Sequence, residues 1–165
     1  MTGHVVVETN VNLTIEPSVR VKFDGTYYLW IKGILKAVGT PTDRIIFTSN
    51  RENPSAGDWT GIFFSDSSID AVFDENGNWI NGSIIKYTII EYGGGGSGPT
   101  TIGGGSGGIL LYAACPFIDN NIFRYNGGSS AALFFNGYGS GSPVLSNNTI
   151  VSNGLAMNVQ QGSPI

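Results

Sequence analysis

Two similar stretches decide the fold of this chain: Pro116-Phe117-Ile118-Asp119-Asn120-Asn121-Ile122-Phe123-Arg124-Tyr125-Asn126-Gly127 and Pro143-Val144-Leu145-Ser146-Asn147-Asn148-Thr149-Ile150-Val151-Ser152-Asn153-Gly154. The second follows the first at an offset of 27 residues, which lies within the range of solenoid repeats. An older copy without the asparagines occupies residues 83–93, and another short apolar segment recurs at 109–112, 133–136 and 157–160. One such coil cannot bury its own apolar face, so the repeat predicts stacked coils around a shared core.

The N-terminal half shows the same repeat of three strands per turn. The predicted strands are 5–8, 13–16 and 19–23, then 27–32, 34–38 and 44–48, then 59–64, 83–87 and 88–92, and then 109–112, 117–120 and 122–125. They are short, rich in Ile, Val, Phe and Tyr, and separated by Gly, Asn and Pro. No stretch has the 3.6-residue apolar period of an amphipathic helix, so we expect very little helix.

The pattern Pro-x-Ile-x-Asn-Asn-x-Ile-x-x-Asn-Gly resembles the repeats of right-handed parallel β-helices, the architecture of pectate lyases and of many bacterial and archaeal surface proteins. Residues 13–23 and 57–62 look like further coils of such surface proteins. The resemblance implies an all-β, pectin-lyase-like solenoid of about five coils with three short strands per coil. It also implies a secreted or cell-surface location. It does not specify an activity, because one fold hosts many functions.

Composition excludes several functional classes. The chain has 165 residues, of which only 12% are charged, with eight Lys and Arg and a net charge of −4. A nucleic-acid partner needs a basic stripe, which so few cations do not supply. No apolar run approaches the ~18 residues of a membrane span, so we expect no membrane insertion. A single cysteine excludes an internal disulfide.

We expect residues 1–165 to form one β-helix domain that is a fragment of a longer protein. Residues 1–3 lead directly into a predicted strand with no signal peptide, and residues 162–165 restart the repeat. Two insertions interrupt the coils, at 65–82 and 93–108. The second is nearly all Gly, Ser and Thr and is predicted to be a flexible loop.

The first insertion contains a possible calcium loop. Asp74, Asn76 and Asn78 have the alternating oxygen-ligand spacing with which calcium loops begin, with Gly77 for the turn. The closing bidentate glutamate of an EF-hand is missing. The alternative is a polar hairpin, since Asn-Gly is a strong turn pair.

Alignment of the repeats predicts which side chains stack. The two expected inward columns are Ile84, Ile118 and Leu145, and Ile89, Phe123 and Ile150. Asn120 and Asn147 are expected to form a hydrogen-bonded ladder, because asparagine suits tight corners and stacked amides pair.

Four charged residues are the candidates for catalysis, namely Lys86, Glu91, Asp119 and Arg124. A polysaccharide lyase needs a base beside the sugar, and an inverting glycoside hydrolase needs two carboxylates roughly 6.5–9.5 Å apart. Alignment places Glu91 with Tyr125, and Asp119 with Ile85, so the two acids lie in different columns. The alternative is that all four are solvated surface charges.

A serine esterase is a further alternative. Residues 104–108 match the Gly-x-Ser-x-Gly motif around Ser106, and His4 is the single candidate base. The motif needs a strand, a sharp turn and a helix, and no helix is predicted.

An apolar column faces outward in the predicted coils. Trp30, Phe63, Leu110 and Phe134 each lie one coil after the last, and strand alternation points them away from the core. Such a column is covered by an insertion, forms a protein interface, or provides a strip on which sugar rings stack.

The sequence therefore predicts an extracellular β-helix scaffold or binding module, with a polysaccharide or a second copy of the chain as partner. We expect a homo-oligomer, most simply a dimer, because uncapped solenoid ends and an outward apolar column both favour contact with another chain.

Overall fold

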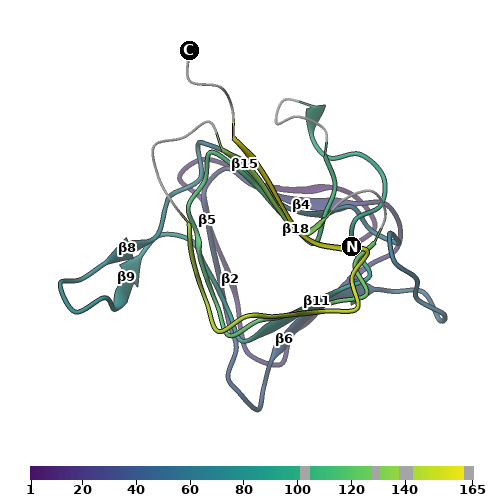
Figure 1. Cartoon of the computed structure of the whole chain (residues 1–165), viewed down its shortest axis with the longest axis horizontal. Coiled ribbons are helices and arrows are strands. Elements are labelled where there is room, and N and C mark those ends of the chain that lie inside the picture. The colour runs from purple at the N-terminus through teal and green to yellow at the C-terminus, as the bar shows by residue number, and fades with distance from the viewer. Residues whose placement is uncertain (101–104, 128–130, 138–142, 162–165) are drawn as a thin grey trace.

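The strands stack into a parallel β-helix whose coils are roughly triangular in cross-section (Figure 1). The computed structural model describes residues 1–100, 105–127, 131–137 and 143–161. Three parallel sheets, here named A, B and C, contain six, five and five strands. The prediction of an all-β solenoid with three strands per coil is confirmed.

Sheet A follows the order β1 (Val5–Val7), β4 (Tyr28–Ile31), β7 (Gly61–Phe64), β12 (Ile109–Tyr112), β15 (Ala131–Gly137) and β18 (Leu155–Gln161). Sheet B contains β2 (Asn12–Ile15), β5 (Ile34–Val38), β10 (Ile84–Lys86), β13 (Phe117–Asp119) and β16 (Val144–Ser146). Sheet C contains β3 (Arg20–Phe23), β6 (Ile45–Ser49), β11 (Thr88–Glu91), β14 (Ile122–Arg124) and β17 (Thr149–Val151). A separate antiparallel hairpin consists of β8 (Val72–Phe73) and β9 (Trp79–Asn81).

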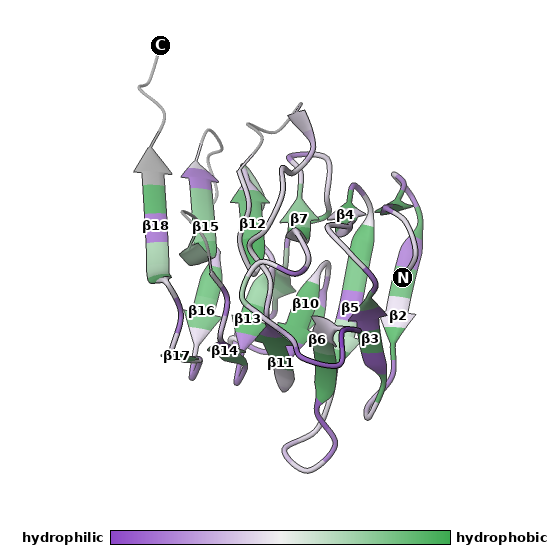
Figure 2. Cartoon of the chain, turned by 90° about the vertical axis from the view of Figure 1, so that its right-hand side faces the viewer, coloured by the Kyte–Doolittle hydropathy of each residue, from purple (hydrophilic) through white to green (hydrophobic). Residues whose placement is uncertain are grey.

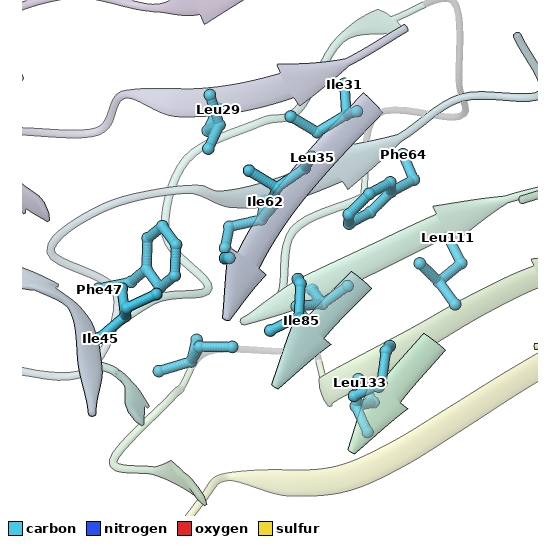
Figure 3. Packing of buried hydrophobic residues seen from close by; sticks show 14 of the residues in the cluster. Leu29, Ile31, Leu35, Ile45, Phe47, Ile62, Phe64, Ile85, Leu111 and Leu133 are labelled. Atoms are coloured by element: carbon cyan, nitrogen blue, oxygen red, sulfur yellow. The ribbon is translucent and has the colours of Figure 1, made fainter. Parts of the chain in front are cut away.

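One apolar core fills the interior of the coils. Every second residue of a strand points inward, so each coil contributes a layer that packs on the layers before and after it. On sheet A the register stacks Leu29, Ile62, Ile109 and Leu133 in one such column. Figure 3 shows these layers meeting side chains from the other two sheets. Apolar strands are aligned along the whole rod in the side view (Figure 2).

The predicted inward columns of sheets B and C are wrong by one residue at a single coil. Ile85, not Ile84, pairs with Ile118, and Ile90, not Ile89, pairs with Phe123. Adjacent isoleucines occupy both faces of these strands. Alternation of polar and apolar residues therefore does not show which of the two faces the core.

Two corners of the C-terminal coils are built by a two-residue unit. Asn120 and Asn147 turn the chain from sheet B to sheet C, and Tyr125 and Ser152 turn it out of sheet C. All four have left-handed backbone, with φ between 54° and 58°. An asparagine follows each of them and turns its side chain to the neighbouring coil.

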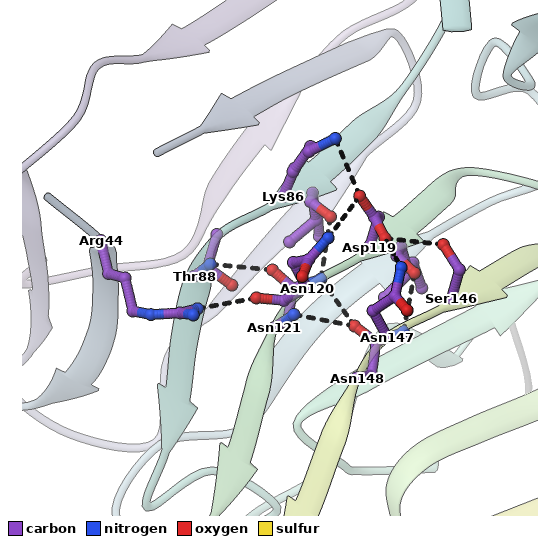
Figure 4. A network of polar contacts seen from close by, with 11 residues as sticks. Arg44, Lys86, Thr88, Asp119, Asn120, Asn121, Ser146, Asn147 and Asn148 are labelled. Carbon is purple, nitrogen blue, oxygen red and sulfur yellow. Dashed lines mark hydrogen bonds and ion pairs between the residues drawn. The ribbon is translucent and has the colours of Figure 1, made fainter. Parts of the chain in front are cut away.

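The asparagine ladder lies one residue beyond the predicted position. Asn121 Nδ2 donates to the carbonyl oxygen of Ile85 at 2.9 Å and to Asn148 Oδ1 at 3.0 Å. Its Oδ1 accepts from the Thr88 N–H at 2.8 Å, which completes the corner shown in Figure 4. Asn120 and Asn147 supply the left-handed turn instead, and their amides donate to Asp119.

A second ladder stabilises the other corner in the same way. Asn126 Nδ2 donates to the carbonyl oxygen of Ile90 at 2.8 Å and to Asn153 Oδ1 at 3.0 Å, and Asn126 Oδ1 accepts from the Gly93 N–H. The ladders thus satisfy main-chain groups that the turns leave without strand partners.

Candidate functional site

The Gly-rich insertion covers the outward face of sheet A. The strand register of sheet A stacks Trp30, Phe63, Leu110 and Phe134 in the predicted column. However, Phe63 and Leu110 are 0% exposed and form a second apolar cluster outside the coil. An insertion therefore covers Phe63 and Leu110, which is the first of the three alternatives for this column. Trp30 and Phe134 remain half-buried at the two margins of this cover.

Glycine allows this cover to pack closely. A side chain on Gly98 would place its Cβ 2.3 Å from the ring of Phe63, and one on Gly105 would lie 3.0 Å from Leu110 Cδ1. The two arms of the insertion are tied together because the Gly98 N–H donates to the carbonyl oxygen of Gly105 at 3.1 Å. The described parts of the insertion are thus a fitted cover rather than a free linker.

The proposed esterase serine belongs to the same cover. Ser106 is buried, and its Oγ donates to the carbonyl oxygen of Gly94 at 2.9 Å. It leads into strand β12, whereas a nucleophile elbow leads into a helix. Gly104 of the motif lies outside the described residues. His4, the candidate base, stacks on the ring of Tyr28 at 3.8 Å. This context does not match a serine hydrolase.

The first insertion is a hairpin with a tight polar turn. The backbone N–H groups of Asn76 and Asn78 both donate to Asp74 Oδ1, at 2.9 and 2.8 Å, and Asn78 Nδ2 donates to Asp74 Oδ2 at 3.0 Å. The Asn78 amide is the main reason why the pKa of Asp74 is lowered. Among the described residues no group of three or more His, Cys, Asp and Glu is placed to hold a metal ion. The turn therefore accounts for Asp74, and calcium stays a prediction.

The β8–β9 hairpin projects from the solenoid beside sheet B (Figure 1). Residues of the hairpin and of sheet B line a groove between them. Phe73 meets the ring of Phe117 edge to face, with centroids 5.1 Å apart. Lys36 Nζ lies over Trp79, 5.5 Å from the ring centroid. The groove has a volume of about 390 Å³ and is lined by Val38, Gly77, Asn78, Trp79, Ile84, Lys86 and Phe117.

Two ammonium groups lie at the groove: that of Lys36 over Trp79 and that of Lys86 in an ion pair. Lys86 Nζ lies 2.9 Å from Asp119 Oδ2, and Asp119 is only 3% exposed. The same carboxylate accepts from Ser146 Oγ at 2.6 Å and from the amides of Asn120 and Asn147 (Figure 4). Burial raises the pKa of Asp119, but these donors together outweigh burial and lower the pKa to about 2. The carboxylate is thus ionised at all physiological pH values.

The other two candidates for catalysis form a matching pair on sheet C. Arg124 Nε donates to Glu91 Oε2 at 2.7 Å, and Thr48 Oγ1 donates to Glu91 Oε1 at 2.9 Å. The register places Glu91 beside Arg124, not Tyr125, and Asp119 beside Lys86, not Ile85.

Both carboxylates are therefore buried and paired, not solvated as the simpler alternative expected. A general base needs a pKa near the working pH and a free oxygen toward the substrate. Every oxygen of Glu91 and Asp119 already accepts a hydrogen bond or faces a cation. The arrangement stabilises neighbouring coils and is poorly suited to proton transfer.

A second, smaller groove lies on the outer face of sheet C. It has a volume of about 340 Å³ and is lined by Ser18, Arg20, Pro41, Thr42, Asp43, Arg44, Ile46 and Ile89. Hydroxyl groups lower the pKa of Asp43, and the largest effect comes from Thr42. The lining thus carries the charges of two arginines and one aspartate.

Trp79 and Phe117 were not identified from the sequence as binding residues. The available signal was the Asn76-Gly77 turn, which places Trp79 near the tip of a hairpin. The sheet on which that hairpin folds is set by tertiary packing, so the pairing of Trp79 with Phe117 could not be predicted.

Comparison with known proteins agrees with this architecture. A family model described as a pectate-lyase like β-helix domain matches residues 1–137. Protein bark beetle of Drosophila melanogaster is 49% identical over 45 residues, which are 27% of this chain and 1% of that protein. No solved structure matches. Since the family model covers most of the coils, the chain belongs to the family of pectate-lyase-like β-helix domains.

Proposed function

We propose that this chain is a non-catalytic, extracellular β-helix module that binds a polysaccharide in the groove between the β8–β9 hairpin and sheet B. The observation that carries the proposal is the composition of that groove. Two aromatic side chains, Trp79 and Phe117, share it with the polar groups of Asn78 and Lys86. Ligand sites typically combine apolar walls with a few polar groups and measure roughly 300–1,000 Å³.

Sugars suit such a surface because their C–H faces pack on aromatic rings while their hydroxyl groups take hydrogen bonds. The indole N–H of Trp79 is buried and has no acceptor among the described residues, which favours an acceptor supplied by a ligand. The Trp30 indole N–H shares this property, so Trp30 is the competing site.

Lys86 is expected to give uronate chains little advantage over neutral sugar chains. Asp119 lies in contact with the ammonium group of Lys86 and cancels its charge. A free carboxylate on the ligand would therefore compete with a carboxylate that is already held in place.

Calorimetric titration with neutral and uronate oligosaccharides, with and without calcium, tests the proposal. Trp79→Ala should abolish binding, and Lys86→Met should weaken it. Ile80→Ala is the matched control, because Ile80 lies on the same strand but is 58% exposed and does not line the groove. Unchanged binding by Trp79→Ala, or loss of binding by Trp30→Ala instead, would exclude this groove. Turnover of any oligosaccharide would show that the module is an enzyme.

The extracellular location is supported by the secreted and surface proteins that share this architecture. Within the described ranges no helix is long and apolar enough to cross a membrane. Secretion of the natural protein into the culture medium, followed with an antibody, tests the location.

Self-association is a second proposal, supported by the side chains of the outward column of sheet A that the insertion does not bury. Val6, which pairs with Trp30, is 37% exposed, and Trp30 and Phe134 are half-buried. Light scattering over a concentration series should show a dimer that Val6→Asp or Phe134→Asp disrupts. A strict monomer at high concentration contradicts the proposal.

A further inference from the structure

Four asparagines form the corner ladders of this chain, and other asparagines begin motifs for N-linked glycans. Three asparagines begin an Asn-x-Ser/Thr motif: Asn12-Leu13-Thr14, Asn81-Gly82-Ser83 and Asn147-Asn148-Thr149. This motif accepts N-linked glycans in proteins that pass through a secretory pathway. None of the four ladder asparagines begins such a motif, so the structural amides and the candidate acceptors are different residues.

Asn12 presents an acceptor on an open face. It begins β2, the last strand in the order of sheet B, and it is exposed together with Thr14. Leu13 and Ile15 point to the core, which places Asn12 and Thr14 on the outward side of the strand. The Asn12 carboxamide makes no hydrogen bond to any residue that the structure describes.

Asn81 presents a second acceptor at the end of β9. A β-bulge in the hairpin leaves Ile80 and Asn81 exposed while Trp79 lies against Lys36. The Asn81 carboxamide, like that of Asn12, has no hydrogen-bond partner in the described part of the chain. A glycan on Asn81 is thus compatible with the fold.

The two acceptors differ in when they can be modified. The Ser83 hydroxyl, which belongs to the motif of Asn81, is buried and accepts from the Leu35 N–H at 3.3 Å. A transferase must therefore reach this motif before the coil folds. Thr14 is exposed, so its motif stays accessible afterwards.

The third motif differs because the fold uses its acceptor nitrogen, although Asn147 and Thr149 are exposed. Asn147 Nδ2 donates to Asp119 Oδ1 at 3.0 Å, and this carboxylate is buried. A sugar would replace one of the two hydrogens on that nitrogen and place a bulky group beside the network around Asp119, so a chain modified there should fold and be secreted poorly.

We propose that Asn12 and Asn81 carry N-linked glycans and that Asn147 does not. The donor is a lipid-diphosphate-linked oligosaccharide. The asparagine Nδ2 bonds to the anomeric carbon, the bond from that carbon to the diphosphate oxygen breaks, and the displaced amide proton leaves with the lipid diphosphate. The inference rests on the proposed extracellular location, because only an exported chain meets the transferase.

The test is secretion of the full chain from a glycosylating eukaryotic host behind an added signal peptide. Enzymatic release of glycans converts each modified asparagine to aspartate, and peptide mass spectrometry locates the change. We expect conversion at Asn12 and Asn81. Asn81→Gln should remove one glycan, and Thr14→Ala should remove the other, whereas Thr14→Ser retains it.

An unmodified Asn12 and Asn81 in the secreted, folded protein would overturn the proposal, and conversion at Asn147 would overturn its exclusion. Because the host signal supplies export, neither outcome bears on the natural location or on saccharide binding. Titration of the Asn12→Gln, Asn81→Gln double variant with oligosaccharide keeps the two questions separate.

Discussion

The two insertions cover two sheets of the same solenoid with opposite results. Over sheet A, the described parts of the Gly-rich insertion, residues 93–100 and 105–108, pack closely on Phe63 and Leu110, which are 0% exposed. Over sheet B, the hairpin of residues 65–82 leaves a groove of about 390 Å³. The difference follows from side-chain size, since glycine approaches a ring directly, whereas Trp79 holds the backbone away from the sheet. In this chain, glycines thus close one outer face, whereas the hairpin with Trp79 leaves a groove over the other.

The sharpest test of the comparison removes a side chain from the closed face. Phe63→Ala should lower the free energy of unfolding by about 3–5 kcal/mol, because it empties a dry cluster that the cover cannot refill. Denaturant unfolding measures this change. Phe117→Ala, on the half-open face, is the matched control and should cost clearly less. Equal losses would mean that the two faces are packed alike.

The second test adds a methyl group where the cover leaves no room for one. Gly98→Ala should destabilise the fold by about 1–3 kcal/mol, because the new Cβ would overlap the Phe63 ring or force the cover outward. Gly25→Ala is a suitable control, since its Cβ would make only ordinary contacts. A neutral Gly98→Ala would show that the cover yields easily.

Acid should lower the free energy of unfolding through Asp119, whose ion-pair partner Lys86 lines the groove. The pKa of Asp119 falls from its usual 3.8 to about 2 in the folded chain. A lowered folded pKa stabilises the fold fully above about pH 4, and this contribution is lost as the pH falls toward 2. The difference corresponds to about 2 kcal/mol of unfolding free energy. Unfolding measured between pH 5 and pH 2 should therefore show a steeper loss for the natural chain than for Asp119→Asn.

Trp79→Ala should change stability by less than about 1 kcal/mol while it abolishes saccharide binding, because Trp79 is half-buried beside a space already open to solvent. Thermal unfolding and calorimetric titration of one sample separate the two effects. A large fall in Tm would make Trp79 a packing residue of the hairpin rather than part of a site.

Calcium removal should have the smallest effect. Both oxygens of Asp74 already accept hydrogen bonds within the turn, so a chelator should leave Tm unchanged. A fall in Tm that Asp74→Ala removes would establish the calcium loop.

The sequence predicts the sheets far better than the site. On sheet A, Leu29 and Ile31 flank Trp30, and the recurrence of such triplets places the outward column correctly. On sheets B and C, runs such as Ile84-Ile85 and Asn120-Asn121 offer two equivalent residues, so the register there slips by one. The groove depends on which sheet the β8–β9 hairpin packs against. The ion pairs depend on the strand register of sheets B and C. Neither can be derived from local pattern.

The amide ladders also determine the order in which coils detach under tension. Asn121 binds the main chain of the coil before it through Ile85, and Asn148 does the same through Ile118. Tension applied at the C-terminal side therefore loads the last coil first and reaches its predecessor only after the amide contacts at both corners break. Under force, these coils should peel away singly in similar steps rather than all at once.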